Sequence, residues 1–175
     1  MKRLAMGVLS VLMVASFAAV ALAQHNPRAT STITIKGKTV SVEYGRPSLK
    51  GRTTDELLGK LKSGGIWRLG ADTSTTFKTG IDLAFGDVTI PAGEYSIWMQ
   101  RQEDNSWKLL FDKKHGQWGE PTPDASECFA SVPLTESKPA QSVEMVTLTL
   151  SKASGGGKLK IEWGTLEASA SFKAK

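Results

Sequence analysis

Apolar and polar residues alternate along most of the chain, as they do in strands that bury one face. Residues 33–35 and 40–44 carry apolar side chains at every second position, and Lys36-Gly37-Lys38 between them suits a tight turn. This pattern predicts an opening β-hairpin. Further short β-rich segments follow at 75–77, 81–85, 88–90, 95–99, 107–111, 128–134, 143–150, 159–163 and 166–172.

Turn-forming residues separate these segments. Pro91-Ala92-Gly93, Asp104-Asn105-Ser106 and Ser154-Gly155-Gly156-Gly157 each lie between two predicted strands, and residues 113–126 form a longer irregular connection. Many short strands joined by polar turns are typical of an all-β fold. We therefore predict a single antiparallel β-sandwich-like domain over residues 24–175.

One segment has a helical period instead. Thr53 and Glu56 have the spacing of a capping box, and Leu57, Leu58 and Leu61 follow on one helical face. The glycines of Ser63-Gly64-Gly65 end this pattern. The sequence predicts one short helix over about 54–62 and no other.

The N-terminus has the three parts of a signal peptide. Lys2 and Arg3 precede an uncharged apolar run over residues 4–23, which ends in Ala21-Leu22-Ala23. Signal peptidase accepts small residues at the first and third of these positions, so residues 1–23 are predicted to be removed and the mature chain to begin at Gln24. A membrane anchor is the alternative. It is disfavoured because polar residues interrupt the run and no basic cluster follows it, so we expect an extracytoplasmic protein without a membrane span after cleavage.

Charge and composition argue against several classes of partner and site. The chain carries 22 basic and 17 acidic residues, and the leader removes two of the basic ones, which leaves a net charge of +3. This ordinary charge and the expected export argue against a nucleic-acid partner. Only two histidines, His25 and His115, and one cysteine, Cys128, are present. The sequence therefore predicts no metal site, no cofactor and no intrachain disulfide.

Motifs of the common enzyme classes are absent from the sequence. We find no phosphate-binding glycine loop, no dinucleotide fingerprint and no serine in the setting of a nucleophile elbow. No complete set of catalytic residues is identified.

Three loop-associated clusters are the best candidates for a working surface, because each places an aromatic residue and polar groups beside glycine or proline at the end of an apolar segment. They are Tyr44-Gly45-Arg46-Pro47 with Lys50 and Arg52, then Trp67-Arg68-Leu69-Gly70-Ala71-Asp72, and His115-Gly116-Gln117-Trp118-Gly119. We predict that they meet at one end of the sandwich. The candidate ligand-binding or partner-binding residues are Tyr44, Arg46, Trp67, Arg68, Asp72, His115, Gln117 and Trp118.

The same clusters are also consistent with a structural plug, in which Arg68 pairs with Asp72 while Trp67 and Trp118 fill the end of the sandwich. The two interpretations predict different mutants. Loss of binding without loss of stability is expected for a binding surface, and a large loss of stability after Arg68→Ala is expected for a plug.

At these clusters the chain resembles the bacterial family called domain of unknown function 2911. The resemblance rests on residues 44–52, on residues 66–72 with 75–77, on residues 91–96, on Gln117-Trp118-Gly119 and on Ile161-Glu162-Trp163, and it spans residues 32–172. It implies a secreted or periplasmic β protein and carries no assigned activity. Where many members have Thr-Gly-Ala-Asn, this chain has Leu69-Gly70-Ala71-Asp72, which adds a carboxylate.

Three classes of function follow from these observations. The leading hypothesis is a non-catalytic extracytoplasmic binding or interaction module for a small molecule, a glycan or an envelope protein. The alternatives are a cell-envelope hydrolase with a site near His115 and Asp72, and a purely structural envelope protein.

Overall fold

The computed structural model describes residues 26–175. The predicted signal peptide and the predicted start at Gln24 lie outside the described residues. Within 26–175, no helix is long and apolar enough to cross a membrane.

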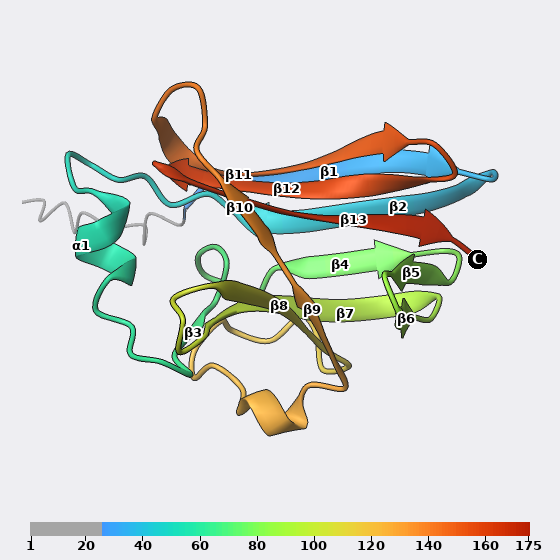
Figure 1. The fold of residues 1–175 in the computed structure, drawn as a ribbon, viewed down its shortest axis with the longest axis horizontal. Coiled ribbons are helices and arrows are strands. Elements are labelled where there is room, and N and C mark those ends of the chain that lie inside the picture. The colour runs from blue at the N-terminus through green and yellow to red at the C-terminus, as the bar shows by residue number, and fades with distance from the viewer. Residues whose placement is uncertain (1–25) are drawn as a thin grey trace, which may run out of the picture.

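Two antiparallel sheets pack face to face, which confirms the predicted all-β sandwich (Figure 1). The first sheet has the order β1 (Arg28–Ile35), β2 (Lys38–Gly45), β4 (Thr76–Thr79), β7 (Gly93–Arg101), β8 (Trp107–Asp112) and β9 (Ala130–Pro133), with β3 (Ile66–Trp67) also paired to β7. The second sheet has the order β11 (Val143–Ala153), β12 (Gly156–Gly164), β13 (Leu166–Ala174), β5 (Leu83–Phe85) and β6 (Val88–Ile90), with β10 (Thr135–Ser137) paired to β13.

The edges of the two sheets lie close to one another, so the sandwich approaches a flattened barrel. β1 runs beside β11, where the backbone N–H of Leu150 donates to Ser31 Oγ at 2.9 Å, and β6 lies beside β9 at the opposite edge. Edge strands covered in this way present few free backbone groups for unwanted pairing.

Aromatic side chains join the two sheets across the core. Phe77 and Phe111 of the first sheet are 5.7 Å apart between ring centroids, and Phe85 and Phe172 of the second are 5.0 Å apart. The Phe85 and Phe111 rings link the two pairs at 5.6 Å. Nearer α1, Trp67 stacks on Trp163 at 5.4 Å. Trp67 is thus a core residue, as the plug interpretation predicts, and is not available to a ligand.

The predicted helix is shorter than expected. α1 spans Thr54–Leu58, with the predicted capping box between Thr53 and Glu56. Gly59, a poor helix former, follows at once, and the next turn tightens because the N–H of Leu61 donates to the carbonyl oxygen of Leu58. The prediction that the helix reaches residue 62 is therefore wrong.

Two further predictions need correction. The irregular connection contains a single 3₁₀ turn, η1 (Ala125–Glu127), capped by Asp124, so β9 begins at Ala130 and not at residue 128. The triple glycine is also not wholly a turn. Gly156 and Gly157 are buried in β12, where a Cβ at Gly156 would overlap the backbone of Phe172 on the neighbouring strand.

Candidate functional site

β7 buries both of its faces, which is unusual for a strand of a two-layer sandwich. Tyr95, Ile97 and Met99 point into the main core, whereas Ser96 and Trp98 alternate with them and face outward. Both outward side chains nevertheless have no exposed area. Residues 113–129, which connect β8 to β9, lie over this outer face (Figure 1).

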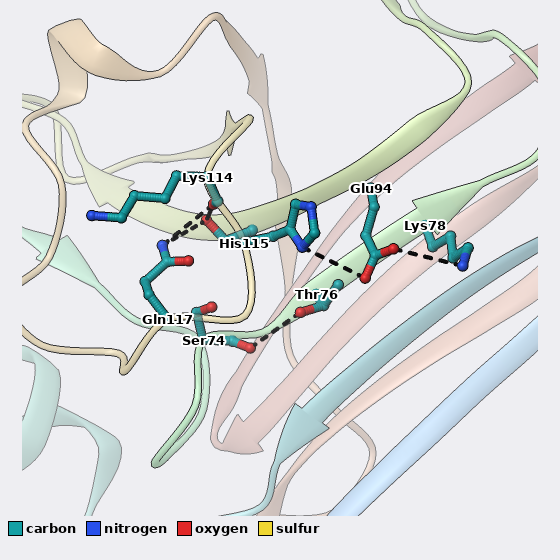
Figure 2. Close-up of polar contacts among 8 residues, drawn as sticks. Ser74, Thr76, Lys78, Glu94, Lys114, His115 and Gln117 are labelled. Atoms are coloured by element: carbon teal, nitrogen blue, oxygen red, sulfur yellow. Dashed lines mark hydrogen bonds and ion pairs between the residues drawn. The ribbon is translucent and has the colours of Figure 1, made fainter.

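Ser96 ties this connection to the sheet. Its hydroxyl accepts a hydrogen bond from Trp98 Nε1 at 2.8 Å and donates to the carbonyl oxygen of Lys114 at 2.7 Å. Gln117 Nε2 contacts the same two oxygens, at 3.4 Å from Ser96 Oγ and 3.3 Å from Lys114 O. Figure 2 shows Gln117 and Lys114 meeting at this point.

The second and third clusters pair through their backbones. The N–H of Ser74 donates to the carbonyl oxygen of Gln117 at 2.8 Å, and the N–H of Gly119 donates to that of Asp72 at 2.8 Å. Thr73 and Trp118 thereby form an isolated antiparallel bridge. The first cluster joins them at Gly45, whose Cα lies directly against the backbone of Ala71. The three segments therefore meet as predicted, although the third extends across the outer face of the first sheet.

Two polar atoms beside this bridge are buried and have no hydrogen-bond partner among residues 26–175. They are Ser74 Oγ and Gln117 Oε1. An unpaired buried polar atom costs about 1–3 kcal/mol, so such atoms are rare in well-packed proteins. Among the described residues, the Gln117 side chain is therefore held through its amide nitrogen alone.

A short row of ionisable side chains borders the same face. Glu94 lies between Lys78 and His115, with 3.6 Å from its Oε2 to Lys78 Nζ and 3.6 Å from its Oε1 to His115 Nδ1 (Figure 2). All three side chains are well exposed, so each contact contributes little to stability. Their arrangement gives this surface acceptors and donors that are available to a ligand.

Trp118 is the most exposed large apolar residue of residues 26–175, at 52%. Its backbone is held by the bridge to Thr73, and Arg28 donates from Nη1 to the carbonyl oxygen of Thr73 at 3.2 Å. The side chain is thus exposed on a fixed backbone, so the prediction of the plug interpretation that Trp118 fills the end of the sandwich is wrong.

Other predicted residues have structural roles. Arg46 donates from Nε to the carbonyl oxygen of Val146 at 3.1 Å and from Nη2 to Thr147 Oγ1 at 3.1 Å, so it fastens the first cluster to β11. Tyr44 is buried in the core.

The predicted ion pair between Arg68 and Asp72 is wrong. No ion pair joins these two described residues within 4.0 Å. The Asp72 carboxylate instead accepts from Asn26, at 2.9 Å from the backbone nitrogen and 3.4 Å from Nδ2. The aliphatic part of the Arg68 side chain packs against Gly119. A Cβ added at Gly119 would lie 2.9 Å from Arg68 Cδ. Packing of this aliphatic part, not charge pairing, holds Arg68 in place.

The hydrolase hypothesis requires His115 and Asp72 to contribute to one site. The carboxylate beside His115 is that of Glu94, whereas the carboxylate of Asp72 is engaged by Asn26. The two residues of the hydrolase hypothesis therefore have separate partners. Within the described residues, no group of three His, Cys, Asp or Glu side chains is arranged to hold a metal ion.

Cys128 lies at the end of η1, partly buried. Burial, followed by the negative charges of Asp112 and Glu127, raises the pKa of its thiol to about 11. The thiol therefore stays protonated at neutral pH, which makes it a poor nucleophile.

Sequence reasoning missed Ser96, Trp98 and Glu94. One signal was present, because Trp98 occupies an outward position of an alternating strand, where a large apolar side chain needs a cover. The cover itself comes from the irregular connection 113–129, whose path has no periodic signal.

The fold and this surface define an antiparallel β-sandwich with one outer face partly covered by a long connection that presents Trp118 to solvent. The chain belongs to the family described as Protein of unknown function (DUF2911), whose profile matches residues 26–172. No curated protein and no solved structure matched the chain.

Proposed function

We propose that the protein is a non-catalytic binding module that captures a glycan or another component of the cell envelope. It does so with the exposed side of residues 115–119, called here the surface around Trp118. The observation that carries this proposal is Trp118, a residue that is 52% exposed and whose backbone is fixed by strand-like bonds. Single exposed apolar residues are common, but a fixed aromatic loses little conformational entropy when a ligand stacks on it.

Polar side chains on the same outer face of the first sheet suit a sugar ligand better than a purely apolar one. Glu94 offers carboxylate acceptors, while His115 and Lys78 offer donors. An aromatic face with polar groups nearby accommodates the apolar face and the hydroxyl groups of a sugar.

The proposed compartment rests on the leader, which ends in Ala21-Leu22-Ala23. Expressed with this leader, the protein should be recovered outside the cytoplasm with Gln24 as its first residue. Edman sequencing of the extracytoplasmic fraction measures this. Membrane-bound protein that retains Met1 would contradict export by cleavage.

Trp118→Ala should weaken glycan binding at least tenfold, because it removes the stacking surface and leaves the backbone bridge intact. Co-sedimentation with purified cell-wall polysaccharide, and titration with soluble oligosaccharides from it, measure the loss. The thermal midpoint should change little, since Trp118 is already largely exposed in the folded protein.

Phe129→Ala is the matched control. Phe129 is the other exposed large apolar residue of the described chain, at 38%, and it lies on the same connection but packs on Tyr95 at 5.1 Å. Glycan binding should survive this substitution. Equal losses from both variants, or full binding by Trp118→Ala, would contradict the proposed surface.

A further inference from the structure

A cleft of about 300 Å³ opens between α1, the β7–β8 hairpin, β10 and the turn from β12 to β13. No residue that lines it belongs to the surface around Trp118. Its apolar wall is made by Leu58, Trp107 and Leu166, and its charged groups include Arg101 and Glu136. This volume is at the lower end of the range for small-molecule sites, so it suits one small ligand and not a polymer.

Arg101 presents a fixed cation to the cleft. Its Nε and Nη2 donate to Asn105 Oδ1 at 3.2 and 2.9 Å, and its Nη1 donates to the carbonyl oxygen of Leu58 at 3.3 Å. The guanidinium carbon also lies 6.0 Å from the ring centre of Trp107. A guanidinium has five N–H donors, so two remain without an acceptor among residues 26–175. A preorganised guanidinium with free donors suits a carboxylate.

Glu136 presents an anion to the same cleft from β10. Within the described part of the chain its carboxylate has no hydrogen bond, and no ion pair joins it to Arg101 within 4.0 Å. Glu136 is exposed, yet partial desolvation of its carboxylate raises its pKa, and the charge of Arg101 offsets this only in part. A cation placed beside this carboxylate would favour its charged form.

The cleft therefore has opposite charges that do not neutralise each other directly, together with an apolar wall. Asp55 and Lys138 also line the cleft, and no ion pair joins them within 4.0 Å. A ligand with a single charge would satisfy one of the two central groups and leave the other unpaired. A ligand with a negative group, a positive group and an apolar side chain would match Arg101, Glu136 and the apolar wall.

We propose that this cleft binds a small zwitterion, an amino acid or dipeptide with an apolar side chain, whose carboxylate lies on Arg101 and whose ammonium group lies on Glu136. This site is independent of the glycan surface. It makes the protein a two-site binder, with a small-molecule cleft under α1 and a stacking surface on the outer face of the first sheet.

The test uses the mature chain and the dipeptide alanyl-phenylalanine in three forms: unmodified, N-acetylated and C-amidated. Calorimetric titration should show saturable binding of the unmodified dipeptide, and each blocked form should bind at least tenfold more weakly because it lacks one charge. Glu136→Gln should lower the affinity for the unmodified dipeptide to that of the wild-type protein for the acetylated one. Glu103→Gln, an exposed carboxylate outside this cleft on the same hairpin, is the matched control and should leave binding unchanged.

Backbone NMR shifts identify the site in the same titration. They should change at Arg101, Trp107 and Leu166, and Trp118→Ala should leave the affinity unaltered. The proposal is overturned by absence of saturable binding up to about 10 mM, by equal affinity for the blocked forms, or by an unchanged affinity in a folded Glu136→Gln variant. None of these results affects glycan binding at Trp118, so the two proposals fail independently.

Discussion

Gly45→Ala should destabilise the protein by about 3 kcal/mol, which corresponds to a fall of about 6–12 °C in the thermal midpoint. A Cβ at this position would overlap the carbonyl oxygen of Ala71 and approach its carbonyl carbon to 3.0 Å. These are backbone atoms, so the strain is relieved only if the loop between β3 and β4 moves. The same loop carries Asp72 and Ser74, which bond residues 117–119.

The substitution should therefore disturb the surface around Trp118 as well as the fold. Amide hydrogen exchange at Ser74 and Gly119 should accelerate, because their N–H groups bond across the two loops. Gly80→Ala is the matched control, since a Cβ there meets its nearest atoms at 3.5 Å and the position has no strained backbone. If Gly45→Ala were as stable as the control, the loop between β3 and β4 would move at little energetic cost, which would contradict this prediction.

The overall fold was predictable because it depends on local signals. Period-two alternation identified most strands, and Lys36-Gly37 forms the turn of the opening hairpin as expected. The capping box at Thr53 and Glu56 marked the start of α1. The end of α1 was missed because Gly59 outweighed the apolar spacing that continues to Leu61.

The surface was predictable only in part. The aromatic and glycine-rich loops predicted which segments meet. The hydrogen-bond partners within these segments depend on how strands distant in the sequence pair. Asp72 was expected to pair with Arg68, four residues away, but it bonds Asn26, which is 46 residues away. Glu94 is brought beside His115 by the path of the connection 113–129. The alternation of a single strand does not contain this information.

Trp98→Ala should cost about 3–5 kcal/mol, as expected for removal of a fully buried large aromatic side chain. Its location makes the consequence specific. Trp98 faces away from the main core and pairs across the strands with Leu110, which is also outside that core. Its Nε1 donates to Ser96 Oγ, the atom that also receives Gln117. Loss of the indole should therefore free residues 113–119 more than it disturbs the two sheets.

Hydrogen exchange separates this effect from general unfolding. In Trp98→Ala, the amide of Lys114, which donates to Asp112 Oδ1 at 3.0 Å, should lose protection before the amides of β12 and β13 do. Trp98→Phe is the matched control, because it keeps most of the ring volume and removes mainly the bond to Ser96, at a cost of about 1 kcal/mol. Phe111→Ala, in the main core, should instead lower protection across both sheets. If Trp98→Ala followed the pattern of Phe111→Ala, the connection over the outer face would belong to the same cooperative unit as the sandwich. The glycan binding proposed for Trp118 would then be lost only when the whole domain unfolds.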